Sequence, residues 1–177
     1  MGTKQCNMFS LRLTILALVI YCSPLYAQDL TPSELTSIKT YKLKRIDSLM
    51  LAKGFEKQVI SEEKGQTITS YTFRKAADAS AVQRSLLVGN MPANHVLDLQ
   101  YGMWQQTESI SFTQQLLRDG YKKVVTSIPD MDGKSAMKMI SYKKGANNIS
   151  YQEKDQGNVK GKNVILYIFS LSNENYR

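Results

Sequence analysis

The chain has 177 residues, of which 42% are hydrophobic and 21% charged, with 23 Lys and Arg against 15 Asp and Glu. This composition supports one domain with an apolar core, or a pair of small repeats, and excludes a broadly disordered chain. His95 is the lone histidine, and both cysteines, Cys6 and Cys22, lie in a stretch that we expect to be removed. A structural disulfide, a cysteine nucleophile, a cysteine-based zinc site and any site with two imidazoles are therefore excluded for the mature chain.

The first 27 residues have the order of regions that a signal peptidase recognises. Lys4 and Arg12 make the start positive, an apolar run of nine residues follows, and Pro24 interrupts it before the small residue Ala27. The apolar run is too short to span a bilayer. We therefore expect residues 1–27 to be a signal peptide and the processed protein to be periplasmic or secreted.

A lipoprotein is the alternative, because cleavage just before Cys22 would leave a cysteine that carries acyl chains. Tyr21 fits this alternative poorly, since the position before such a cysteine normally holds a small residue. An uncleaved interfacial anchor is a further alternative. With cleavage after Ala27, the mature chain has no cysteine, and the loss of Lys4 and Arg12 lowers the formal net charge from +8 to +6.

Two stretches carry helix signals. Thr31-Pro-Ser-Glu34 has a capping hydroxyl, a proline at the first helical position and a glutamate where a capping box requires it. An apolar stripe at helical spacing then predicts one helix that Gly54 ends, with the stripe formed by Leu35, Ile38, Ile46, Leu49 and Met50. Ser111-Phe-Thr-Gln114 is a second capping box, which predicts a helix that begins there and ends at Gly120.

The segments around the two glycines are similar. At a constant offset of 66 residues, 51–59 and 117–125 share Leu, Gly, an aromatic residue, Lys and Val. Each continues into a strand, a polar turn and a second strand with a Ser-Tyr pair. Further strands are predicted in both halves, and the full set after the turns is 67–74, 85–88 and 96–104, then 135–142, 148–153 and 164–171, with a polar loop at 155–162.

These elements predict an α+β fold of two tandem helix-plus-four-strand antiparallel units that share one curved sheet. Residues 28–106 form the first α+β repeat and residues 107–177 the second, within one compact domain. Because the internal match is short, chance similarity is the alternative to a true repeat. Two separate sheets are the alternative to one.

In this order of elements the mature chain resembles the β-lactamase-inhibitory-protein-like architecture. In that family two such repeats make a long curved sheet whose concave face grips a partner protein. The resemblance covers nearly all of the mature chain and implies a protein binder. The family's repeats carry disulfides whereas this mature chain has no cysteine, and no inhibitor contact residue is carried over. Small PepSY-like exported domains share the order of a helix followed by strands.

The patterns for catalysis and metal binding are weak. Asp98 follows His95 by three residues on a strand, a spacing that points the two side chains to opposite faces. Asp130-Met-Asp-Gly133 resembles the start of a calcium loop, but Ser141 stands where the closing Glu is needed, and Asp-Gly between strands is a hairpin signal. We therefore expect no catalytic residue, no metal site, no cofactor and no enzyme activity. The alternative is a carboxylate-based enzyme, or a binder, that acts on a cell-envelope glycan.

The aromatic residues of the strands give the strongest indication of function. Alternation along residues 96–104 puts Trp104 on the open face or edge of the sheet and four side chains in the core, namely Leu97, Leu99, Tyr101 and Met103. Tyr and Trp supply large contact area at low entropy cost. We therefore predict a secreted or periplasmic binding module that engages a protein partner through an aromatic sheet face formed by Trp104, Tyr71, Tyr142, Tyr151 and Tyr167. A second core layer and a homodimer interface are the alternatives.

Basic residues recur in pairs, at Lys44-Arg45, Lys122-Lys123 and Lys143-Lys144. With the positive net charge, they favour an anionic envelope polymer or an acidic protein patch as partner, or they form an ordinary solvated surface. No nucleic-acid-binding signature accompanies them, so we expect no nucleic-acid partner. We also expect no transmembrane segment in the mature chain.

Overall fold

The computed structural model of the protein describes residues 29–63, 66–74, 82–90, 96–129, 136–159 and 162–172. The expected signal peptide, His95 and the turn at residues 130–133 lie outside these ranges. The described elements, in chain order, are α2 (Pro32–Ile38), α3 (Leu43–Ala52), β1 (Glu56–Glu63), β2 (Gln66–Arg74), β3 (Val82–Asn90), β4 (Val96–Met103), α4 (Gln106–Arg118), β5 (Lys122–Pro129), β6 (Ala136–Lys144), β7 (Asn147–Val159) and β8 (Lys162–Ser172). None of these helices is long and apolar enough to cross a membrane.

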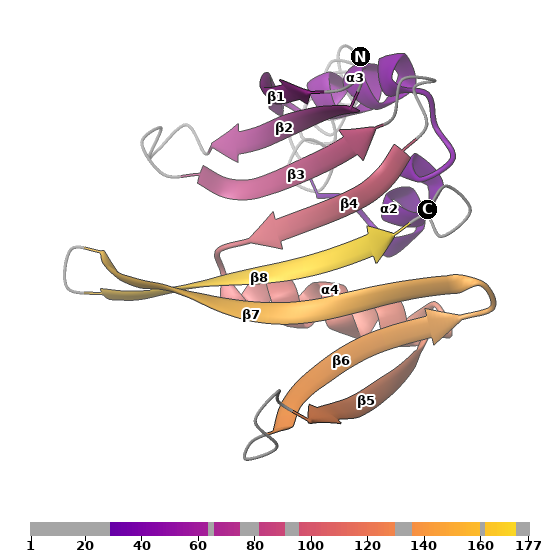
Figure 1. The fold of residues 1–177 in the computed structure, drawn as a ribbon, viewed down its shortest axis with the longest axis vertical. Helices are drawn as coiled ribbons and strands as arrows, with labels where there is room; N and C mark the ends of the chain where they lie inside the picture. Colours follow the sequence, from indigo (N-terminus) through magenta and orange to yellow (C-terminus); the bar gives the residue numbers. More distant parts are fainter. Residues whose placement is uncertain are drawn as a thin grey trace, which may run out of the picture.

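The strands form one eight-stranded antiparallel sheet in the order β1-β2-β3-β4-β8-β7-β6-β5. Figure 1 shows the sheet as twisted and curved, with β4 beside β8 at its centre and β1 and β5 at its two edges. The helices are segregated to one side of this sheet, which confirms the predicted α+β class and the single sheet.

One row of directly opposed residues crosses all eight strands and locates the core. Its central members are fully buried, and their side chains join those of the helices in one apolar cluster. From β1 to β5, the row is Lys57, Tyr71, Leu86, Tyr101, Phe169, Tyr151, Ile140 and Val125. The helices cover this face, with α4 behind β7 and β8 in Figure 1, and no described helix covers the other face.

The first predicted helix is wrong in one respect, because two helices replace it. The capping box is confirmed, since the Thr31 hydroxyl accepts from the Glu34 N–H at 3.1 Å and the Thr31 N–H donates to the Glu34 carboxylate at 2.8 Å. The chain then leaves the helix between Ile38 and Leu43. Near the end of α2, the Ser37 and Thr40 hydroxyls donate to backbone carbonyls, and such bonds compete with helix continuation.

The predicted start of the second helix is also wrong, because α4 begins at Gln106 and Ser111 lies within it. Gln105 is the N-cap and has no capping hydrogen bond from its side chain. The buried stripe of α4 starts at Ser109, whose small polar side chain is 3% exposed and gives no apolar signal. The apolar stripe that the sequence shows therefore begins at Phe112, about one turn after the first buried residue of α4.

Both glycines that were expected to end helices do so, with the same backbone geometry. Gly54 and Gly120 have φ angles of 81° and 87°, a region that L side chains rarely adopt. The following residue donates back to the helix in each case, from Phe55 to the Met50 carbonyl and from Tyr121 to the Leu116 carbonyl, both at 3.0 Å. This pattern is the Schellman end of a helix.

The predicted polar loop at residues 155–162 is replaced by the continuation of a long hairpin. The ladder between β7 and β8 extends to the pair Val159 and Lys162, across a register shift between Asp155 and Asn158. Within that shift the Gly157 N–H donates to the Asp155 carboxylate at 2.7 Å, and Gly157 has a φ of 82°. The hairpin projects beyond its neighbours in Figure 1. Because its side chains from Gln152 to Asn158 are all exposed, no burial pattern marked it as a strand.

Candidate functional site

Trp104 lies at the end of β4, on the face of the sheet that no described helix covers. Its neighbours on the strand, Tyr101 and Met103, are buried on the helix-covered face, so Gly102 between them points to the open face. A Cβ atom built on Gly102 would lie 3.8 Å from the indole Cζ3 of Trp104. The half-buried indole is therefore seated over a glycine on the open face, as the alternation predicted.

The expectation that four tyrosines join Trp104 in one aromatic surface is corrected by their burial. Tyr71, Tyr142 and Tyr167 are 0%, 2% and 6% exposed and belong to the core under the helices. Tyr151 is partly buried and packs against the same core, with its ring centroid 5.1 Å from that of Phe169. The physical reason is the register, since Tyr71 and Tyr151 belong to the inward row and Tyr142 faces Lys123 on that same side.

The open face around Trp104 is formed by small and apolar side chains. The position of the Gly102 Cβ would be only 2.9 Å from the Ser85 hydroxyl oxygen and 3.1 Å from Leu166 Cδ1, so no larger residue fits there without a shift. The partly buried side chains that point to this side of β3 and β8 are Ser85, Leu87, Val164, Leu166, Ile168 and Ser170. This surface is mostly apolar and lies beside the indole.

A hollow of about 240 Å³ lies at the other end of the same face. Ile68, Leu87 and Gly89 form its apolar part, and Gln66, Asp98 and Gln100 contribute polar side chains. Asp98 accepts a hydrogen bond of 2.6 Å from the hydroxyl of Ser172 on β8. The open face therefore has an aromatic end at Trp104 and a hollowed end near the β2–β3 hairpin.

Two basic pairs meet at the β5 end of the sheet. Lys122 lies directly opposite Lys143 in the β5–β6 ladder, and both are exposed on the open face. Like charges directly opposite one another are destabilising. Lys144, on the helix-covered side, instead donates to the Asp119 carbonyl at 2.6 Å and lies 5.7 Å from the centre of the Tyr121 ring.

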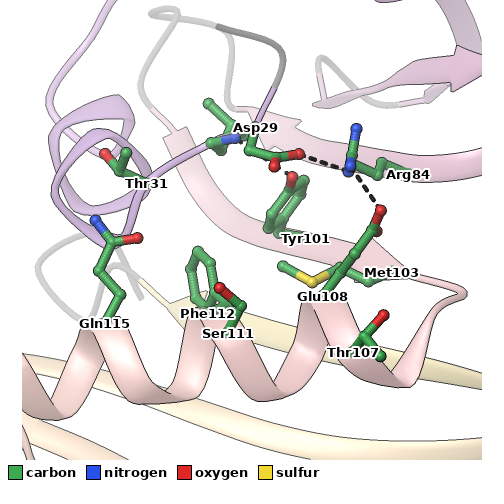
Figure 2. A pocket seen from close by; sticks show the side chains of 11 residues that line it. Asp29, Thr31, Arg84, Tyr101, Met103, Thr107, Glu108, Ser111, Phe112 and Gln115 are labelled. Atoms are coloured by element: carbon green, nitrogen blue, oxygen red, sulfur yellow. Dashed lines mark hydrogen bonds and ion pairs between the residues drawn. The ribbon is translucent and has the colours of Figure 1, made fainter. Parts of the chain in front are cut away.

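A cavity of about 380 Å³ lies between β3, β4, α4 and the segment before α2 (Figure 2). Tyr101, Met103 and Phe112 supply its apolar wall, and Thr107, Ser111 and Gln115 line it from α4. The buried Tyr101 hydroxyl accepts a hydrogen bond of 3.4 Å from the Leu30 N–H. Burial raises the pKa of Tyr101 well above its usual value, so the phenol is neutral at physiological pH.

Arg84 is the central polar residue of this cavity, and Figure 2 shows it between two carboxylates. Its Nε lies 2.7 Å from Asp29 Oδ1, and its Nη2 lies 2.7 Å from Glu108 Oε1. The guanidinium also lies 5.4 Å from the centre of the Phe73 ring. This cluster was not predicted from the sequence. One sign of it was visible in the sequence, because Arg84 alternates with Leu86 and Val88 and therefore lies on the inward face of the strand. A charged side chain in that place requires a buried partner.

This ionic cluster is built to hold segments together. The Asp29 and Glu108 carboxylates both bind the Arg84 guanidinium. These ion pairs hold the segment before α2, strand β3 and helix α4 against one another. Within the described part of the chain, no three His, Cys, Asp or Glu side chains gather in a way that could hold a metal ion. The basic pair Lys44-Arg45 is exposed and lies outside the cavity.

Comparison with known proteins identifies no relative. No protein-family model matches the chain, and neither a curated protein nor a solved structure matches it.

Proposed function

We propose that the protein is a secreted or periplasmic, non-enzymatic binding module that engages a protein partner through the open face of its sheet. The observation that carries this proposal is the indole of Trp104, half-buried over Gly102 on a face that no described helix covers. A tryptophan flanked by apolar side chains such as Leu87 and Leu166 is the type of residue that contributes most to binding energy in protein interfaces.

The partner that fits this face has an apolar pocket or rim for the indole and acidic groups beyond it. Lys122 and Lys143 stand opposite one another on the same face, at its β5 end. A partner carboxylate placed between them would relieve their mutual repulsion. The partner that we propose is therefore an acidic protein surface. The experiment below distinguishes it from an anionic envelope polymer.

We also propose that two tandem helix-plus-four-strand units, within residues 28–106 and 107–177, build this face. Two observations support a duplication. The hydrogen bonds that end α3 and α4 recur at an offset of 66 residues, from Met50 and Phe55 to Leu116 and Tyr121. The two outer hairpins also share a register, since Lys57 faces Tyr71 and Lys123 faces Tyr142. This symmetry supports the resemblance to the β-lactamase-inhibitory-protein-like architecture.

The test is capture of a partner from native envelope extract by the purified, naturally processed protein. We expect one protein to be enriched by the wild type and lost with Trp104→Ala, while Trp104→Phe retains part of the binding. Ile110→Ala is the matched control, because Ile110 is 49% exposed on α4, on the covered side of the molecule. It removes apolar surface without touching the open face, so capture should be unchanged.

Isolated partner and protein are then titrated against one another. Lys143→Glu should weaken binding of an acidic protein by about tenfold or more, with a strong dependence on salt. Equal capture by the wild type, Trp104→Ala and Ile110→Ala would refute the proposed surface. Enrichment of a polymer in place of a protein, equally dependent on Lys122 and Lys143 but indifferent to Trp104, would replace the proposal by glycan or polymer binding.

A further inference from the structure

The two edge strands of the sheet have equal lengths, opposite directions and complementary charges. β1 and β5 have eight residues each and stand 66 positions apart in the chain. Among the residues that the structure describes, β1 pairs only with β2 and β5 only with β6, so each presents one side of its backbone without a described partner strand. Unpaired edges of this kind accept a further strand by backbone hydrogen bonding.

The directions of the two edges are compatible with continuation of the sheet. Every neighbouring pair in the sheet is antiparallel, and seven such pairings separate β1 from β5, so these two strands point in opposite directions. A second copy placed in the same orientation therefore brings its β1 antiparallel to β5 of the first copy. The contact joins two different surfaces, and it leaves an unused edge at both ends of the pair.

The exposed apolar side chains of the two edges occupy equivalent positions. Val59 on β1 is 52% exposed and Val125 on β5 is 55% exposed, and both point toward the helix-covered side. Ile60, which is 56% exposed, occupies the register shift between Val59 and Ser61. Large apolar side chains with this exposure on an unpaired edge favour a partner that covers them.

The charges of the two edges are complementary. β5 begins with Lys122 and Lys123 and carries no acidic residue, whereas β1 ends with Glu62 beside a second glutamate. The lysine of β1, Lys57, is already held by Asp47 at 2.9 Å. Antiparallel pairing with Glu62 opposite Lys123 also brings Val59 opposite Val125 across the Ile60 bulge, and all four side chains are then on the helix-covered side.

We propose that β1 of one copy of this chain pairs antiparallel with β5 of a second copy, in this register, to form head-to-tail assemblies. The bulge at Ile60 and the two lysines of β5 hinder unselective pairing, as such features do on natural sheet edges. The acidic, bulged edge of β1 is therefore the partner that matches the basic edge of β5. The part of the open face around Trp104 is not used by this contact, so each copy in an assembly keeps the aromatic part of its proposed binding surface.

The test is sedimentation velocity of the purified protein from micromolar to millimolar concentration, at low and at high salt. We expect the weight-average sedimentation coefficient to rise with concentration past that of a dimer at low salt, because a head-to-tail contact does not close on itself, and to fall at high salt. Glu62→Lys and Lys123→Glu should each weaken the apparent association by about tenfold or more. Both positions are exposed, so neither change disturbs the core.

The charge swap provides the decisive control. The double variant Glu62→Lys, Lys123→Glu should regain association, and so should an equimolar mixture of the two single variants, because each new edge then meets an opposite charge. Lys154→Glu makes the same charge change on the exposed face of β7 and should leave association unchanged. A protein that stays monomeric throughout, an equal effect of Lys154→Glu, or association that responds to Glu62→Lys and not to Lys123→Glu would overturn the proposal.

Discussion

Arg84 on β3 and Glu108 in the first turn of α4 are joined by a hydrogen-bonded ion pair of 2.7 Å. The two residues belong to different halves of the chain, whose strands otherwise meet only where β4 pairs with β8. Asp29 binds the same guanidinium from the segment before α2. The side chain of Arg84 is 11% exposed and that of Glu108 is 20% exposed, so this junction is largely removed from water.

Replacement of Arg84 by methionine should lower the free energy of unfolding by about 2–4 kcal/mol, because it leaves the Glu108 carboxylate without its guanidinium in a largely buried place. The Asp29 contact adds little to this figure, since the Asp29 side chain is 53% exposed. Urea denaturation followed by circular dichroism measures the change. The double variant Arg84→Met, Glu108→Gln should be more stable than Arg84→Met alone. A loss below about 0.5 kcal/mol for Arg84→Met would show that the cluster is not a structural clamp.

Gly54→Ala and Gly120→Ala should each destabilise the protein by about 1–2 kcal/mol, because alanine is strained at the positive φ of both helix ends. Space is not the cause. The nearest atoms to a new Cβ are Phe73 Cε2 at 3.7 Å for Gly54 and Lys144 Cε at 4.0 Å for Gly120, which is ordinary van der Waals contact.

The two losses should be equal within about 0.5 kcal/mol, and they should add in the double variant. Thermal and urea unfolding of the three variants measure this. Gly145→Ala, at a φ of 56° with open space around it, is a control for positive φ outside a helix end. A large loss at one helix end and none at the other would argue against equivalent units.

Much of the fold could be predicted because its periodic signals are local. The capping box at Thr31, the two glycine stops and the alternation that leads to Trp104 depend on residues within one or two turns of each other. The break between α2 and α3 was missed because the apolar stripe resumes at Ile46 in phase with Ile38, which conceals four intervening residues. The outer part of the β7–β8 hairpin was missed, although strands at 148–153 and 164–171 were predicted, because the β7 side chains from Gln152 to Asn158 are all exposed.

The candidate site was predicted only in part, because alternation gives relative faces and not which face the helices cover. Alternation along a single strand correctly placed the side chains of Trp104 and Tyr101 on opposite faces of the sheet. Tyr71 and Tyr151 are on other strands, and the face of each depends on cross-strand register, which no local pattern fixes. The Arg84 cluster brings together residues that are 24 or more positions apart, so only its inward charged residue was visible.

Glu34→Gln should lower stability at neutral pH by less than about 1 kcal/mol, and the difference should vanish in acid. Burial raises the pKa of the Glu34 carboxyl, but the hydrogen bond from the Thr31 N–H and the ion pair with Lys53 at 2.9 Å outweigh it, so the pKa lies below its ordinary value of 4.5.

A carboxyl whose pKa is lower in the folded state than in the unfolded state stabilises the fold above the unfolded pKa and loses this contribution as the pH falls. Urea midpoints of wild type and Glu34→Gln should therefore differ near neutrality and converge below the lowered pKa. A difference that persists unchanged in acid would attribute the effect to the capping box and not to the charge.

Alkaline pH should unfold the protein through three tyrosines. Burial is the main cause that raises the pKa of Tyr71, Tyr101 and Tyr151 above the ordinary tyrosine value of 10.0. Two of them also donate hydrogen bonds of 2.6 Å to carboxylates, from Tyr71 to Asp47 and from Tyr151 to Glu153, which disfavours the charged phenolate further.

Since these phenols hold their protons more tightly in the folded state, their contribution to stability is intact below pH 10 and is lost as the pH rises above it. Each can lower the free energy of unfolding by at most about 1.4 kcal/mol per pH unit in that range. Tyrosinate absorbance and circular dichroism, recorded in one titration, should show these tyrosines ionising only as the fold is lost. Tyr151→Phe should reduce the slope of stability with pH by about a third, since one of three such groups is removed. Full ionisation of every tyrosine with the sheet signal intact would contradict the burial on which this prediction rests.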